Sequence, residues 1–125
     1  MGHYSGQVIV NYNIDNSPIP FNTVRCIEWH NDAIWVGTET GLAQLQDEQW
    51  QIYNASNSAL YSDNIRSLKS DGDSLLWIGT MQGGLFCFDG ETWTNYNYAN
   101  SGLTDNIVRS VYIDQNAYIW MATTE

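Results

Sequence analysis

The chain has 125 residues, the length of a single domain, and its hydrophobic content of 43% is sufficient for a core. Its 4 basic and 14 acidic residues give a formal net charge of −10, so its surface should repel nucleic-acid phosphates and anionic lipid headgroups. We therefore expect no nucleic-acid and no membrane partner. The apolar runs are also too short to span a bilayer.

The first expected strand ends in a tyrosine and is followed by a polar loop. Three stretches share this pattern: residues 7–12, 49–53 and 92–96. The tyrosines that align are Tyr12, Tyr53 and Tyr96. The loops are rich in Asn, Ser, Pro and Gly, which are typical turn formers. An apolar residue follows each loop at the same offset: Ile19, Leu60 and Leu103.

A second expected strand begins after each loop, and a turn connects it to a five-residue motif. These strands start at Val24, Ile65 and Val108. The turns lie at 30–32, 71–73 and 114–116. The motif reads Ile-Trp-Val-Gly-Thr at 34–38, Leu-Trp-Ile-Gly-Thr at 76–80 and Ile-Trp-Met-Ala-Thr at 119–123. We interpret it as a short buried strand that ends in a turn glycine, which Ala122 replaces in the third copy.

A fourth type of strand follows the motif and completes the repeat. It is expected at 42–45 and 85–88, and the Asp89–Gly90 pair then predicts a hairpin turn. The unit therefore contains four short strands in roughly 42 residues, which is typical of a β-propeller blade. We predict an all-β propeller of four-stranded blades with three repeats. The repeats cover approximately 22–62, 63–105, and a split repeat of 106–125 plus 1–21.

The repeat resembles the two-component regulator propeller repeat. The second copy carries the pattern best, at Asp63, Ile65, Ser67, Leu68, Asp71, Gly72, Leu76, Trp77, Ile78, Gly79, Thr80, Gly84, Leu85, Phe88 and Asp89. All three copies keep the same register, although the first lacks the Asp-Gly turn. The resemblance implies the large sensory propellers of hybrid two-component regulators, whose chains are far longer than this one.

Three blades cannot close a ring, because propellers typically have four to eight blades. We expect a head-to-tail homodimer in which two chains form a six-bladed ring. Each junction would be one composite blade, with two strands from each chain. The alternative is that the sequence is part of a longer propeller.

All three arginines, Arg25, Arg66 and Arg109, occupy the same position of the repeat, on the inner strand. A cationic ring in the channel could bind an anion or a carboxylate, because guanidinium is a rigid set of donors. Alternatively, each arginine braces its own blade by pairing with nearby acids or loop carbonyls.

The tryptophans predict core positions, whereas several other aromatic residues are not repeated. The expected core residues are Trp35, Trp77 and Trp120, with Trp50 and Trp93 on outer strands. The aromatic residues that do not follow the repeat are Trp29, Tyr61, Tyr98, Tyr112 and Tyr118. Such residues could stack on sugar rings, so a carbohydrate-binding, lectin-like propeller is the alternative function.

We expect no catalysis and no cofactor or metal. The two histidines and the isolated Cys26 and Cys87 form no recognisable catalytic or metal-binding grouping, and the cysteines are expected to be buried. Asp71 and Asp73 lack the other ligands of a calcium loop.

The expected function is a binding or sensory scaffold for a small molecule, glycan or protein, and a propeller lyase or hydrolase is the third option. A complete chain would be cytoplasmic, and one whose leader was removed would be periplasmic or extracellular.

Overall fold

The computed structural model describes residues 2–4, 9–11, 15–17, 23–60, 62–72 and 74–123, which form strands and turns without a helix. The strands are β1 (Gly2–Tyr4), β2 (Ile9–Asn11), β3 (Val24–His30), β4 (Ala33–Thr38), β5 (Leu42–Gln46), β6 (Gln49–Tyr53), β7 (Ile65–Ser70), β8 (Leu76–Thr80), β9 (Leu85–Phe88), β10 (Trp93–Tyr96), β11 (Val108–Ile113) and β12 (Ile119–Thr123).

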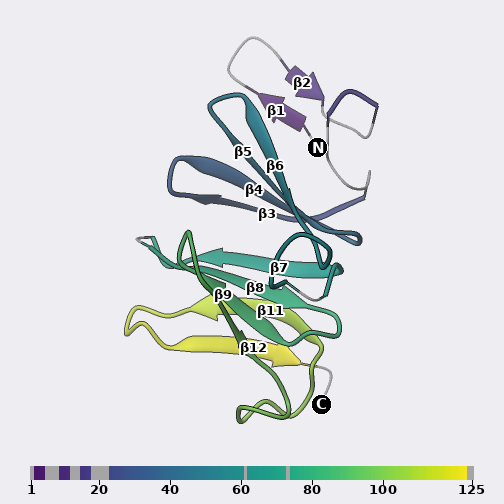
Figure 1. The fold of residues 1–125 in the computed structure, drawn as a ribbon. Helices are drawn as coiled ribbons and strands as arrows, with labels where there is room; N and C mark the ends of the chain where they lie inside the picture. The colour runs from purple at the N-terminus through teal and green to yellow at the C-terminus, as the bar shows by residue number, and fades with distance from the viewer. Residues whose placement is uncertain are drawn as a thin grey trace.

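The strands form two complete four-stranded antiparallel sheets and two pairs of strands. Blade 1 has the order β3-β4-β5-β6, and blade 2 has the order β7-β8-β9-β10. The inner pair β11-β12 follows blade 2, and the outer hairpin β1-β2 precedes blade 1 (Figure 1). The predicted all-β fold with four-stranded propeller blades is therefore confirmed.

Hairpin turns form where the sequence supplies residues that tolerate positive φ. Asn31 and Asp32 have φ values of 50° and 60°, which suit the two-residue turn between the paired residues His30 and Ala33. The predicted turn at Asp89–Gly90 is also present, with φ of 103° at the glycine. These turns place consecutive strands side by side in each sheet.

A repeated hydrogen-bond pattern shapes the loop that leaves each complete blade. The Oδ1 of Asn54 accepts hydrogen bonds from the backbone of Ser56 and Asn57. The same pattern recurs one repeat later, where Asn97 Oδ1 accepts from Ala99 and Asn100. The polar loops seen in the sequence therefore fix the path of the chain from one blade to the next.

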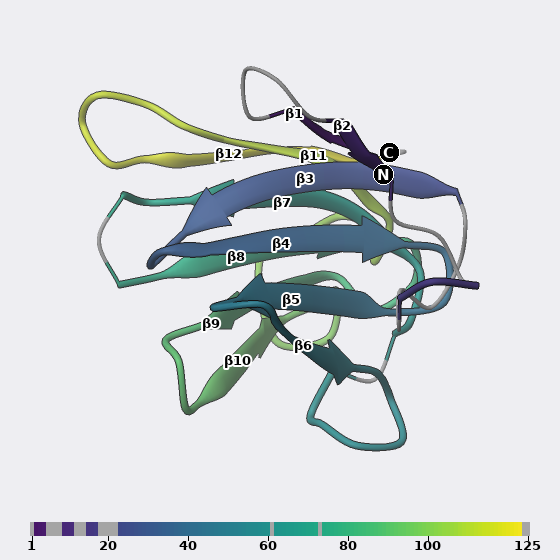
Figure 2. The ribbon, with the colours of Figure 1, turned by 90° about the horizontal axis from the view of Figure 1, so that it is seen from above.

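The core lies between the sheets, which overlie one another face to face (Figure 2). One cluster fills the space between blades 1 and 2 and includes Trp35, Leu60, Leu68, Ile78 and Phe86. A second, smaller cluster between blade 2 and the inner pair contains Leu85, Val108 and Val111. Both faces of blade 2 are therefore covered, which explains its nearly continuous apolar strands.

The motif glycines are not turn residues, and this corrects the expectation from sequence. Gly37 and Gly79 lie within strands β4 and β8, and neither has a positive φ. A Cβ at Gly37 would lie 2.6 Å from Ile65 Cγ2 of the next sheet. A Cβ at Gly79 would lie 2.9 Å from the Val108 carbonyl oxygen. Glycine is required here because successive sheets approach closely.

Some expected features lie outside the described residues. These are the alignment of Tyr12, the apolar position Ile19, the unrepeated aromatic Tyr61 and the second aspartate of the 71–73 turn, Asp73.

We predict that Gly79→Ala destabilises the fold by about 1–3 kcal/mol, because the new methyl group would force blade 2 away from Val108. Urea unfolding followed by circular dichroism measures this loss. Gly102→Ala is the matched control, since a Cβ there would meet nothing within 4 Å. Equal unfolding midpoints for the two variants would contradict the close-approach explanation.

Candidate functional site

The three arginines share an unusual backbone position. Strands β3, β7 and β11 are the first strands of successive sheets, and β7 contacts both of the others. In each strand the pairing register shifts around the arginine, so that Arg25, Arg66 and Arg109 are the extra residues of three equivalent β-bulges. Bulges redirect side chains, so the fold places these arginines at equivalent sites of neighbouring strands.

Their side chains nevertheless have different surroundings. Arg25 forms an ion pair with Glu39, and both side chains are about one-third exposed. The Nε of Arg66 is buried without a hydrogen-bond partner. Arg109 is exposed. The arginine recurs in each copy of the repeat, but the glutamate that pairs with Arg25 does not. Met81 stands in blade 2 where Glu39 stands in blade 1.

The expected core tryptophans differ in burial. Trp35 is only 2% exposed and stacks on Tyr53, with ring centroids 5.7 Å apart. Trp93 is partly buried and stacks on Phe88 at 4.2 Å. Trp77 packs against the second cluster, and Trp50 is half-buried.

Trp120 differs from the expectation for a core residue, because it is 61% exposed. Its Nε1 donates a 2.8 Å hydrogen bond to Asp114 Oδ2, and this bond is the main reason why the pKa of Asp114 is lowered. Trp120 is exposed because no sheet of the described residues covers this face of the inner pair. The unrepeated aromatics Trp29, Tyr98, Tyr112 and Tyr118 are exposed as well.

A polar cleft lies at the end of blades 1 and 2, around His30, and the sequence patterns did not predict it. We call it the His30 cleft. It consists of two adjoining cavities of about 280 and 270 Å³ that share His30 and Asn31. The larger cavity is also lined by Trp35, Gln44, Gln46, Gln51, Tyr53, Phe88 and Gly90. The smaller one is also lined by Trp29, Asp32, Ser70 and Gly72.

The cleft offers hydrogen-bonding groups beside an exposed aromatic ring. Gln44 and Gln51 contribute amides, and Trp29 contributes its exposed ring. The Nε1 of Trp35 is buried without a hydrogen-bond partner, although its residue lines the larger cavity. Neutral amides next to an aromatic surface suit a small, polar and uncharged ligand.

One signal in the sequence could have revealed this cleft. Gln44 and Gln51 pair with each other across β5 and β6, and the residues paired at the same position of blade 2 are Cys87 and Thr94. The glutamines therefore depart from the repeat. Residues that the shared packing of the blades requires recur in each copy. These glutamines do not recur in blade 2, so the shared packing does not require them.

His30 in the cleft and the nearby Glu28 of the same strand make structural contacts. His30 is buried, and its Nδ1 lies 2.6 Å from Ser70 Oγ. The Glu28 carboxylate accepts hydrogen bonds from the backbone of Trp29 and Ser70. These contacts join blade 1 to blade 2. Among the described residues, no group of three or more His, Cys, Asp or Glu side chains could hold a metal ion.

Neither cysteine has the properties of a catalytic nucleophile. Burial raises the pKa of the Cys26 thiol to about 12. Burial, together with the charges of Asp71 and Asp89, raises the pKa of the Cys87 thiol to about 11. Both thiols are therefore protonated at neutral pH, whereas nucleophilic attack requires the thiolate.

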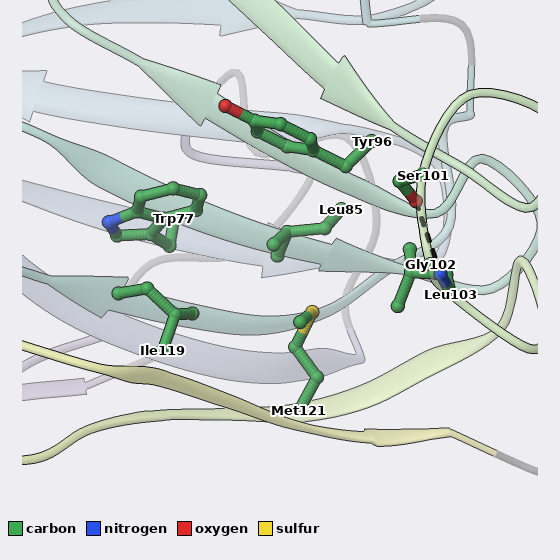
Figure 3. Close-up of a pocket in the computed structure, with 8 residues that line it drawn as sticks. All are labelled: Trp77, Leu85, Tyr96, Ser101, Gly102, Leu103, Ile119 and Met121. Atoms are coloured by element: carbon green, nitrogen blue, oxygen red, sulfur yellow. Dashed lines mark hydrogen bonds between the residues drawn. The ribbon is translucent and has the colours of Figure 1, made fainter.

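An apolar cavity of about 310 Å³ lies between blade 2 and the inner pair (Figure 3). Trp77, Leu85 and Tyr96 of blade 2 form one side of it, and Ile119 and Met121 of β12 form another. A loop of residues 101–103 closes one end, where the Leu103 amide donates to Ser101 Oγ. We call it the third-blade cavity. Its lining carries little polarity that could orient a small ligand.

The described residues contain no helix long and apolar enough to cross a membrane.

Comparison with known proteins identifies structural neighbours, while no protein-family model and no curated protein matches the chain. The extracellular domain of the hybrid two component system BT3049 from B. thetaiotaomicron matches with a TM-score of 0.75 and 25% identity. The extracellular domain of the one component system BT4673 from B. thetaiotaomicron matches with a TM-score of 0.60 and 20% identity. Each match covers 94% of this chain, but only 17% and 22% of those chains. The resemblance to two-component regulator propeller repeats is thereby confirmed.

We predict that both cysteines react slowly with a thiol reagent in the native protein at about pH 8 and rapidly after unfolding, because their native pKa values are raised. The raised values also mean that the free energy of unfolding falls as the pH rises above the ordinary thiol value of 9.0. Labelling kinetics with Ellman's reagent measure the reactivity. A Gln115→Cys variant provides an exposed thiol as the control, and equal rates for all three thiols would contradict the prediction.

Proposed function

We propose that this chain belongs to a non-catalytic propeller that recognises a ligand and serves as a sensory scaffold. The observation that carries this proposal is the fold, which is shared over 94% of the chain with the extracellular domain of a two component system. The chain spans only 17% of the length of that neighbour. The proposed sensory role therefore concerns the propeller repeats of this chain and not the other parts of the neighbour. The same likeness supports a periplasmic or extracellular location.

The His30 cleft is the ligand site that we favour within this scaffold. Its amides depart from the repeat, whereas the arginines follow it, and repeated side chains in such proteins usually serve repeated packing. The ion pair of Arg25 with Glu39 further supports a brace for that arginine. An uncharged ligand would also avoid repulsion by a chain with a net charge of −10.

A carbohydrate is the second candidate function, in which the propeller acts as a lectin. The exposed ring of Trp29 lines the cleft beside Asn31 and Asp32, and it could stack on one face of a sugar. The amides of Gln44 and Gln51 would then hydrogen-bond hydroxyl groups in the adjoining cavity. Cleavage of an added oligosaccharide would instead support a lyase or hydrolase.

We predict that a neutral oligosaccharide raises the melting temperature of the protein, because a ligand that binds the native state stabilises it. Gln44→Ala should weaken binding about tenfold, equivalent to about 1.4 kcal/mol, since one amide contact is lost. Thermal-shift screening followed by calorimetric titration measures both effects. The panel should include citrate and phosphate as anionic probes.

Arg66→Ala is the matched control for this experiment. It should leave oligosaccharide binding unchanged, because Arg66 does not line either cavity of the His30 cleft. If the anions stabilise the protein and Arg66→Ala removes that effect, the arginine position is the ligand site and the cleft is not. If no probe of either class binds, the proposed uncharged ligand class is wrong.

A further inference from the structure

The outer hairpin β1-β2 has the geometry of the outer half of a blade. Tyr4 pairs with Ile9, just as Leu45 pairs with Trp50 and Phe88 with Trp93. In all three hairpins the same number of residues separates the two partners. The inner pair β11-β12 has the register of the inner half of a blade, including its bulge. The described residues thus hold two complementary half-blades, at opposite ends of the stack (Figure 1).

The third-blade cavity lies where an outer half-blade would continue the sheet of the inner pair. Its residues Ile119 and Met121 stand at the positions that Leu76 and Ile78 occupy in blade 2. Leu76 and Ile78 are fully buried, and Phe88 and Phe86 of β9 pair with them along the sheet. Met121 is 37% exposed and lines the cavity. In blade 2, β9 occupies the corresponding space. The cavity is therefore the space that an equivalent strand would fill beside β12.

The two ends of the stack also expose matching apolar positions. Each internal interface joins the motif tryptophan of one sheet to an apolar residue on the first strand of the next. Trp35 and Leu68 share the first core cluster, and Trp77 packs against the second cluster, which contains Val111. The same two positions at the free ends are Trp120, which is 61% exposed, and Ile27, which is 53% exposed.

We propose that a second copy of this chain binds two surfaces: the third-blade cavity and the uncovered face of the inner pair that exposes Trp120. The β1-β2 hairpin of the second copy pairs with β12 and completes a composite blade, and Trp120 then covers Ile27 of the second copy. The surfaces are complementary because they are the two halves of one interface that the chain already contains twice. Two such junctions related by a two-fold axis close a ring of six blades.

This junction differs from the internal interfaces at the position of the motif glycine. Ala122 stands where Gly37 and Gly79 allow close approach, and its partner position in the second copy is Val24. A Cβ at Gly79 would lie 2.9 Å from Val108, so Ala122 must hold the junction slightly more open. The junction is therefore weaker than the internal interfaces, and Ala122→Gly should tighten the dimer.

Light scattering coupled to size exclusion tests the proposal on the full chain. We expect a mass of two chains of 14.2 kDa at micromolar concentration. Met121→Glu places a charge in the third-blade cavity and should reduce the mass to one chain. Gln115→Glu, which adds the same charge in the exposed turn between β11 and β12, should leave the dimer intact. Circular dichroism of both variants verifies that they are folded.

A cysteine pair tests the register of the composite blade without disrupting it. Ile78 pairs with Phe86 in blade 2, and the equivalent pair across the junction is Met121 with Gly2 of the second copy. Oxidation of the Gly2→Cys, Met121→Cys double variant should yield a covalent dimer, and neither single variant should do so. A monomeric wild type, a mass above two chains, or a double variant that does not cross-link would each overturn the proposal.

Discussion

Each sheet of this protein depends on a neighbouring sheet to cover its face. The side chains of blade 2 are apolar on both sides, and a four-stranded sheet of this size cannot bury them by itself. Face-to-face packing removes this apolar surface from water, with the Trp35, Phe86 and Phe88 rings at its centre. The close approach permitted by Gly37 and Gly79 is what makes this packing tight.

The same constraint separates structure from recognition within a blade. Positions that face a neighbouring sheet are repeated, because every interface must have the same spacing. Positions at the turn end of blades 1 and 2 are free to vary, and the His30 cleft forms there from residues such as Gln44 and Gln51. A ligand site can therefore differ from one interface to the next while the packing stays constant.

Much of the fold could be predicted from the chain, whereas little of the candidate site could. The period of the tryptophan motif and the Asp-Gly turn indicated the blades, because both are local features. The roles of individual repeated residues were harder to predict. The motif predicts a turn at Gly79 because glycine is common in turns, whereas the close approach of Gly79 to Val108 is a contact between sheets. Trp120 has the same motif context as Trp35 but lacks a covering sheet among the described residues.

The sequence by itself determined the repeat, the number of strands in each blade and the registers that the turns impose. These properties follow from residues close together in the chain. Only the tertiary structure decided which faces are covered, that the arginines lie in bulges, and that His30 of blade 1 meets Ser70 of blade 2 beside a polar cleft. Those properties depend on distances between residues some forty positions apart, which periodicity does not specify.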